Sequence, residues 1–181
     1  MVCIGSWYRS YPEAYALGLL PFLKVIRVIT YSLLTLMFFN YHFMLPRGIR
    51  NNNPLNIRRS KDQWQGLRAQ QTDSAFCQFE SLEYGWRAAF YLLTRTYYHK
   101  YRLYTIRKII NKWAPPNENL TATYIQNVSR LTGIAPDEPI GIPSDQPQRW
   151  MAVGMAMAIQ ENGTESLDYF AMLRGWGMCR E

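Results

Sequence analysis

The stretch RGIRNNNPLNIR, residues 47–58, decides how the rest of the chain is interpreted. Three consecutive asparagines, a proline and a fourth asparagine suit neither a helix nor a central strand. Asparagine tolerates left-handed backbone and bonds to its own main chain, and proline fixes a turn. The segment is predicted to be an ordered loop rich in amide donors and acceptors, which suit hydrogen bonds to a sugar or an N-acetyl group. A plain surface turn is the alternative interpretation.

Size and composition limit the classes of function. The 181 residues fit one domain with an appendage, and the chain carries a net charge of +7 and a 15% aromatic share. A basic surface suits nucleic acid, anionic lipid or an anionic cell-wall polymer, but no run of like charge singles out nucleic acid, which is not expected as a partner. The three scattered cysteines and two histidines lack metal-ligand spacing, so no metal site or cofactor is expected, and Ser-His or Cys-His chemistry is not expected either.

Residues 1–45 differ in character from the rest of the chain. Residues 28–45 contain no acidic or basic side chain, while Lys24 and Arg27 precede them and Arg47 follows. Eighteen residues lie at the short end of a membrane span, and Asn40 and His42 weaken the segment further. The segment is predicted to be a membrane or signal-anchor, or else an upstream extension if Met44 is the true start.

Residues 46–181 predict an α+β domain that is mainly helical. Short strands are expected at residues 56–59, 64–68 and 76–79, from their alternating pattern and flanking turns. Helices are expected at residues 82–100, 105–114, 121–132, 148–161 and 165–173, from their apolar periodicity and end signals. The first of these helices is apolar around most of its circumference, which is typical of a central helix.

Catalysis in such a chain would depend on carboxylates. Glycoside cleavage needs a carboxylic acid that stays protonated near neutral pH, which an apolar setting favours. Glu161 ends a helix rich in Met and Ala, and Asn162-Gly163 follows, so its carboxyl is expected to face a cleft. A solvent-exposed glutamate at a helix end is the alternative. Glu118, within WAPPNENLT, is the second catalytic candidate, with a helix-capping role as its alternative.

Four motifs carry a resemblance to a known family. They are RGIRNNNPxNIR at residues 47–58, WxG at residues 64–66, FxxFxSxxYGxRA at residues 76–88 and WAPPxENxTxxYI at residues 113–125. In order and spacing they resemble a family of phage and prophage virion structural proteins, some of them described as lysozyme-like. A looser similarity extends to bacterial wall glucosaminidases and lytic transglycosylases. In those enzymes the helix ending in Glu precedes the Asn-rich loop, whereas here its best match, residues 159–163, follows it, as in a circular permutation.

The resemblance implies a lysozyme-like domain over residues 46–181 that cleaves peptidoglycan as a glycosidase or lytic transglycosylase. It would be virion-associated or exported to the cell envelope, with Glu161 as general acid. The saccharide cleft would be lined by Asn52, Asn53, Asn56, Trp64 and Tyr84. The alternative is a non-catalytic virion structural protein that binds cell wall or capsid partners. Expected partners are peptidoglycan strands, other virion proteins and, through residues 28–45, a membrane.

Overall fold

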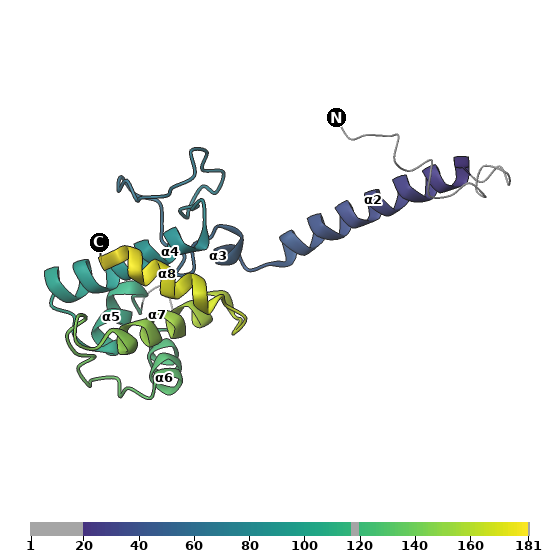
Figure 1. The fold of residues 1–181 in the computed structure, drawn as a ribbon. Coiled ribbons are helices and arrows are strands. Elements are labelled where there is room, and N and C mark those ends of the chain that lie inside the picture. The colour runs from purple at the N-terminus through teal and green to yellow at the C-terminus, as the bar shows by residue number, and fades with distance from the viewer. Residues whose placement is uncertain (1–19, 117–119, 181) are drawn as a thin grey trace. The chain divides into compact units, whose positions relative to one another are not determined.

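The computed structural model describes residues 20–116 and 120–180, and the chain divides into two compact units, Met1–Leu45 and Pro46–Glu181. The first unit contains the helix α2 (Leu20–Met44), of 25 residues (Figure 1). Its described side chains, at residues 22–37, are all exposed. The membrane segment expected at residues 28–45 falls mostly within α2. Among the described residues, no helix is both long and apolar enough to cross a membrane.

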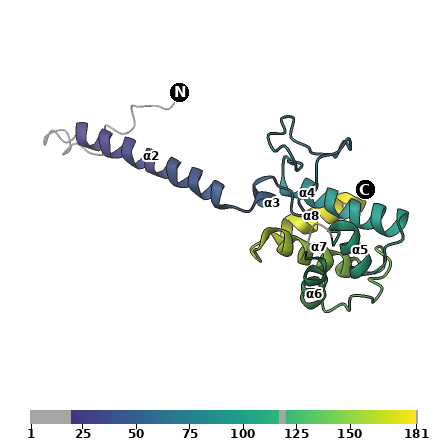
Figure 2. The same cartoon turned by 180° about the vertical axis from the view of Figure 1, so that it is seen from behind.

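The second unit is an assembly of helices joined by loops (Figures 1 and 2). In chain order its elements are α3 (Arg47–Arg50), α4 (Leu82–Phe90), η2 (Tyr91–Lys100), α5 (Ile106–Trp113), α6 (Thr121–Thr132), α7 (Pro147–Asn162) and α8 (Tyr169–Arg180). The expected mainly helical character is therefore confirmed, whereas the small β region of the expected α+β class is reduced to isolated bridges. Within the described residues, the regions expected as strands form only the isolated bridges Arg58–Phe76 and Leu67–Phe79.

Side-chain amides supplement the few backbone hydrogen bonds between these segments. The Asn53 amide donates to the carbonyl oxygens of Ile57 and Cys77 at 3.0 and 2.9 Å, and accepts from the Ile57 N–H at 2.8 Å. Gln78 Oε1 accepts from the N–H groups of Thr72 and Asp73 at 2.6 and 3.1 Å. Local side-chain bonds of this kind compete with regular secondary structure. The expected segments do pair through a few backbone bonds, Arg59 N–H to the Ala75 carbonyl and Cys77 N–H to the Ile57 carbonyl, both at 2.9 Å. The pairing stops at single bridges, and side-chain amides bind the backbone around them.

The helix expected at residues 82–100 is confirmed as the central one, formed by α4 and its continuation η2. Trp86, Phe90 and Leu93 on it are fully buried. The second half, η2, is π-helical, a wider form with i→i+5 hydrogen bonds that is rare in proteins. The Trp86 side chain stacks on the Phe90 ring at a centroid distance of 5.4 Å, and the Trp176 ring of α8 meets Phe90 edge-on at 4.9 Å. These aromatic contacts place the core of the unit around the central helix.

Capping residues in the sequence correctly predicted where most of the remaining helices begin or end. Thr105 caps α5 through a hydrogen bond from the Lys108 N–H at 3.3 Å, as expected. Gly133 and Gly163 end α6 and α7 in the left-handed conformation that glycine adopts without strain. The last helix, expected at residues 165–173, instead begins at Tyr169. Asp168 explains the shift, because its carboxylate accepts from the Ala171 N–H at 2.9 Å and so caps the start of α8.

Helices α4 and α8 pack against each other at a close contact (Figures 1 and 2). Gly175 lies at this contact, and a Cβ there would overlap Trp86 and approach the Glu83 carbonyl oxygen to 2.8 Å. Two residues further along the same helix, Gly177 has open space around the position of a Cβ. The pair separates the effect of helix packing from the effect of helix propensity.

We expect Gly175→Ala to lower the free energy of unfolding by about 1–3 kcal/mol, because an extra methyl group must displace backbone of the partner helix. Gly177→Ala is the matched control and should be neutral or stabilising by roughly 0.5–1 kcal/mol, since alanine is the better helix former. Urea denaturation of both variants measures this. Equal effects of the two substitutions would contradict the close packing of α4 on α8.

Candidate functional site

Glu161 lies in the last turn of α7, half-buried, with its carboxylate facing the helices α5 and α6. Its Oε1 accepts hydrogen bonds from the Trp113 indole Nε1–H at 2.9 Å and from the Tyr124 hydroxyl at 3.0 Å. Trp113 is the last residue of α5, and Tyr124 lies in the first turn of α6. A carboxylate at a helix C-terminus is not helped by the helix dipole, so these donors supply the stabilisation.

The Asn-rich loop reaches the same carboxylate. The Asn56 side-chain amide donates to Glu161 Oε2 at 3.2 Å and, more weakly, to the Glu161 carbonyl oxygen at 3.4 Å. Asn56 has a φ of 50°, in the left-handed region that few residues other than glycine and asparagine adopt. The conformation that the Asn-Pro-x-Asn sequence permits thus turns this amide toward Glu161. Segments about a hundred residues apart in sequence meet at one carboxyl group.

The two oxygens of Glu161 have unequal surroundings. Oε1 is held by two donors, whereas among the described residues Oε2 has a single bond, to Asn56. Burial, followed by the charge of Glu161, raises the pKa of Tyr124 well above its usual value, so this hydroxyl keeps its proton and remains a donor. Two donors fix the carboxyl group in place at Oε1. Oε2 is the oxygen with a lone pair left for another molecule.

Gly48 and Asn162 form the support behind this site. The Asn162 amide donates to the carbonyl oxygens of Pro54 and Ala158, both at 2.8 Å, which ties the loop to α7. A Cβ at Gly48 would overlap Asn162 and lie 2.8 Å from the Asn53 carbonyl oxygen. Only glycine therefore allows α3 and the loop to approach the end of α7 this closely.

The other predicted saccharide ligands have different surroundings. Asn53 is fully buried and its amide is occupied by loop backbone, so its part in a site is to hold the loop. Asn52, with φ 52°, donates to the carbonyl oxygens of Phe79 and Glu80 at 3.0 and 3.2 Å. The Trp64 ring meets Tyr91 edge-on, and Tyr84 packs beside Gly66. No hydrogen bond or ring contact in the described chain joins Asn52, Trp64 or Tyr84 to Glu161. Glu118 lies outside the described residues.

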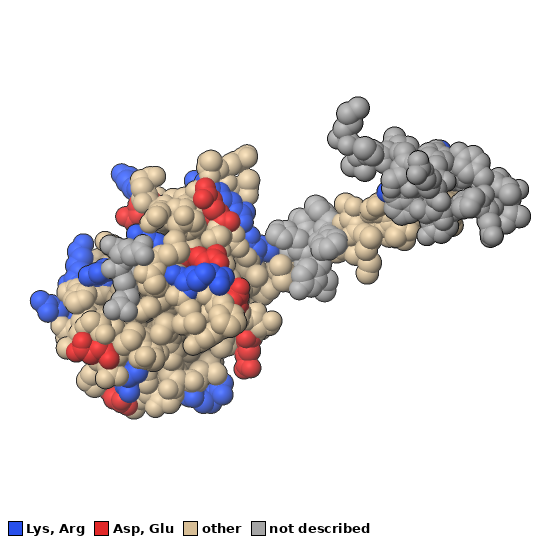
Figure 3. All heavy atoms as spheres, viewed as in Figure 1, with Lys and Arg blue, Asp and Glu red and all other residues tan. Residues whose placement is uncertain are grey.

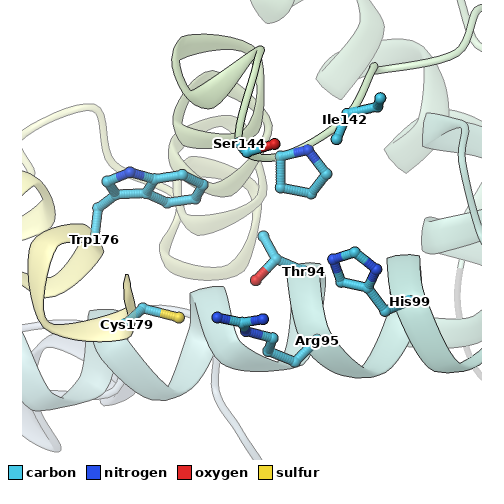
Figure 4. Close-up of a pocket in the computed structure, with 8 residues that line it drawn as sticks. Thr94, Arg95, His99, Ile142, Ser144, Trp176 and Cys179 are labelled. Carbon is cyan, nitrogen blue, oxygen red and sulfur yellow. The ribbon is translucent and has the colours of Figure 1, made fainter. Parts of the chain in front are cut away.

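A separate cavity of about 160 Å³ opens between η2, the loop before α7, and α8 (Figure 4). Its lining includes Arg95 and His99 on the central helix, Ser144 on the loop, and Trp176 and Cys179 on α8. Ser144 lies just before the start of α7, whereas Glu161 lies in its last turn, so a helix of 16 residues, about 24 Å, separates this cavity from the carboxylate. Burial raises the pKa of the Cys179 thiol, which makes it a poor nucleophile.

The part of the chain that the structure describes holds no group of three or more His, Cys, Asp or Glu side chains placed to bind a metal ion. The surface charge on the face shown in Figure 3 is mixed, with basic side chains spread over the second unit and acidic ones among them. No continuous basic surface is visible on that face. The grouping of aromatic and amide donors around Glu161 is therefore the most developed site for chemistry among the described residues.

Comparison with known proteins gives the family. No protein-family profile matches the chain. Protein P5 of Pseudoalteromonas phage PM2 is 39% identical to it over 136 residues, which span 72% of this chain and 81% of the relative. The chain belongs to the family of Protein P5. The expected phage origin is thereby confirmed.

Sequence reasoning did not assign Trp113 or Tyr124 to the site of this P5-family protein. Trp113 was visible as one apolar position of a helix, and Tyr124 as another. The indole N–H of Trp113 and the hydroxyl of Tyr124 each need a hydrogen-bond partner when they are buried. This requirement is the one feature of the sequence that could have pointed to a polar site beside them. Their partner could not be named from spacing alone, because α5, α6 and the end of α7 meet only in the folded chain.

The P5-family loop is anchored at its start by Asp73. The Asp73 carboxylate accepts from Arg47 Nε and Nη2 and from the Asn51 amide, all at 2.7 Å, and from the N–H groups of Ala75 and Phe76. The Arg47 guanidinium, with these further donors, holds the pKa of Asp73 well below its usual range. The Asp73 side chain is only 9% exposed, so the pair is not an ordinary surface ion pair.

We expect Asp73→Asn to cost about 1–3 kcal/mol of unfolding free energy at neutral pH, because charge-assisted bonds at the loop anchor are lost. Since folding lowers the pKa of Asp73, its contribution is complete above the unfolded value near 4 and is lost as the pH falls. The difference between wild type and variant should therefore shrink from about pH 5 toward pH 2 in urea denaturation. Asp137→Asn, in an exposed pair with Arg107, is the control and should change stability by under about 1 kcal/mol. A difference that does not vary with pH would contradict the anchor.

Proposed function

We propose that this phage-derived protein cleaves the glycan strand of peptidoglycan, as a glycosidase or lytic transglycosylase, with Glu161 as the general acid. The observation that carries the proposal is the arrangement of the Glu161 carboxyl group, fixed at Oε1 by Trp113 and Tyr124 and left with one amide contact at Oε2. A general acid must be held rigidly and still have one oxygen directed at its substrate.

The proposed step begins with a proton on Oε2. That proton passes to the glycosidic oxygen as its bond to the anomeric carbon breaks, and the leaving sugar departs as an alcohol. Negative charge then develops on the carboxylate, where the Trp113 N–H and Tyr124 O–H groups already point at Oε1. Donors placed in advance at the oxygen that gains charge lower the barrier.

Substrate-assisted chemistry completes the reaction without a second protein carboxylate. The N-acetyl oxygen or the 6-hydroxyl of the substrate attacks the anomeric carbon, a recognised exception to the use of two carboxylates. With the N-acetyl group, water later opens the cyclic intermediate and a hydrolase results. With the 6-hydroxyl, its proton returns to Glu161 and an anhydro-sugar product results. In the hydrolytic case the attacking water gives its proton to the Glu161 carboxylate. In both cases Glu161 is therefore protonated again at the end of the reaction.

The loop side chains have the proposed role of holding the strand. Asn56 contacts both the carboxylate and the loop, so a bound N-acetyl group near Oε2 would meet its amide. We assign Asn52 to the rim of the same loop and Asn53 to its support, with Trp64 and Tyr84 as ring surfaces for sugar faces. Peptidoglycan is then the primary partner, and association with the virion brings other virion proteins into contact with this chain.

A second candidate function is a non-catalytic virion protein that binds the wall or capsid partners. The three donors on Glu161 favour it in one respect, because they join α5, α6 and the Asn-rich loop to α7. A carboxylate with those bonds serves equally well to hold a scaffold together. In that case the wild-type protein releases no sugar, and Glu161 contributes to stability alone.

We expect Glu161→Gln to lower the rate of glycan release from purified cell walls by at least about a hundredfold, because glutamine cannot donate the proton. Mass spectrometry of the soluble products measures the rate and also distinguishes reducing ends from anhydro-sugars. Glu165→Gln, four residues further along in an exposed position, is the matched control and should retain activity.

Two results would contradict the assignment of the general acid. Unchanged release by Glu161→Gln would remove Glu161 from the chemistry. No release by the wild type, together with wall binding, would favour the non-catalytic virion protein.

A further inference from the structure

Tyr101, at the end of η2, is an aromatic side chain placed between two cations. It is 44% exposed, and Lys100 Nζ and Lys112 Nζ lie 5.6 and 5.5 Å from the centre of its ring. Lys100 belongs to η2 and Lys112 to α5, so the tertiary fold brings them together. Such distances are those of cation–π contacts. We name this group of three side chains the Tyr101 platform.

The two lysines of the Tyr101 platform form no ion pair with an acidic side chain of the described residues. Their distances to one ring place the ammonium groups at most about 11 Å apart. Both positive charges therefore lie within reach of one extended anionic ligand. Both side chains are exposed. A ligand that carries carboxylates would contact both, most strongly at low ionic strength.

The backbone at the Tyr101 platform is held in a costly conformation. Arg102 follows Tyr101 with a φ of 58°, in the left-handed region. The turn is fixed by hydrogen bonds from the Tyr101 N–H to the Thr96 carbonyl and from the Leu103 N–H to the Tyr97 carbonyl, both at 2.9 Å. Strained residues other than glycine persist where the surroundings enforce them, and they cluster at binding and active sites.

A row of rings connects the Tyr101 platform to Glu161. The ring centre of Tyr101 lies 6.1 Å from that of Tyr97, and Tyr97 lies 6.2 Å from Trp113. Trp113 donates its indole N–H to Glu161. Tyr97 is buried, so it serves as the rigid link, whereas Tyr101 presents its ring to solvent. The platform is therefore fixed relative to the carboxyl group by packed aromatic side chains.

We propose that Tyr101, Lys100 and Lys112 form a subsite for a carboxylate-bearing part of the glycan strand whose cleavage is assigned to Glu161. The ammonium groups would bind carboxylates of its substituents or attached peptides, and the exposed part of the Tyr101 side chain would contact the sugar beside them. This inference rests on the proposed function for the choice of polymer. One exposed ring differs from the succession of stacked rings with which proteins follow single-stranded nucleic acid, so a glycan is the better match.

The test measures binding separately from cleavage, in the Glu161→Gln background. Cell-wall glycan with its peptides attached, the same glycan after enzymatic removal of the peptides, and neutral chitin oligosaccharides are compared by co-sedimentation or calorimetry at low ionic strength. We expect Lys100→Gln with Lys112→Gln to weaken binding to the peptide-bearing glycan roughly twofold to thirtyfold, the range for two exposed charge contacts. Binding to the neutral oligosaccharides should change by less than about twofold.

Two controls keep this test independent of folding and of the catalytic proposal. Arg130→Gln removes one exposed positive charge from α6, away from the Tyr101 ring, and should leave binding unchanged. Unfolding temperature should be the same for all variants. Equal binding of the lysine variant and its parent to the peptide-bearing glycan would overturn the subsite, as would a lysine-dependent preference for single-stranded DNA over the glycan. If wild-type protein releases no sugar but the lysine-dependent binding is found, the catalytic proposal fails and the subsite stands.

Discussion

The hydrogen bonds to the Glu161 carboxylate are the interaction on which the arrangement of the second unit depends. They join the end of α7 to α5 through Trp113, to α6 through Tyr124 and to the Asn-rich loop through Asn56. A carboxylate that is half-buried needs donors, because each lost hydrogen bond to a charged group costs about 1.5–3 kcal/mol. The same bonds fix one oxygen of the carboxyl group with two donors and leave the other with the Asn56 amide.

The Asn-rich loop shows how a short polar sequence can take the place of a sheet. Asn53 bonds to the backbone of Ile57 and Cys77, and Asp73 binds Arg47 and Asn51 at the start of the loop. Asn52 and Asn56 adopt left-handed backbone, and Gly48 allows the close approach to α7. The left-handed conformations of Asn52 and Asn56 cost conformational free energy that a plain surface turn does not require. Their common effect is to set the Asn56 amide against Glu161, which agrees with a loop built for a site.

Local signals in the sequence predicted much of the secondary structure. Contacts between residues far apart in the sequence could not be predicted from it. Thr105, Gly133 and Gly163 located helix ends because their effects involve only neighbouring residues. The alternation at residues 56–79 suggested strands, and these segments do pair, but only as isolated bridges. A sequence pattern cannot show that side-chain amides will bind much of the backbone around each bridge. Glu161 and the loop were both chosen as candidates from a resemblance, and the structure brings Asn56 and Glu161 together. Trp113 and Tyr124 were missed because the sequence does not show which acceptor their indole N–H and hydroxyl groups will meet. The π-helical form of η2 had no sequence signal either.

The central claim is that the Asn-rich loop and the end of α7 are energetically coupled through Asn56 and Glu161. A double-mutant cycle measures this coupling from the unfolding free energies of Asn56→Gly, Glu161→Ala and the combined variant. Glycine is chosen at position 56 because it accepts the left-handed backbone and removes only the amide. The account predicts a coupling energy of about 0.5–3 kcal/mol in favour of the pair. Additive effects, within about 0.3 kcal/mol, would contradict it and would separate the loop from the carboxylate.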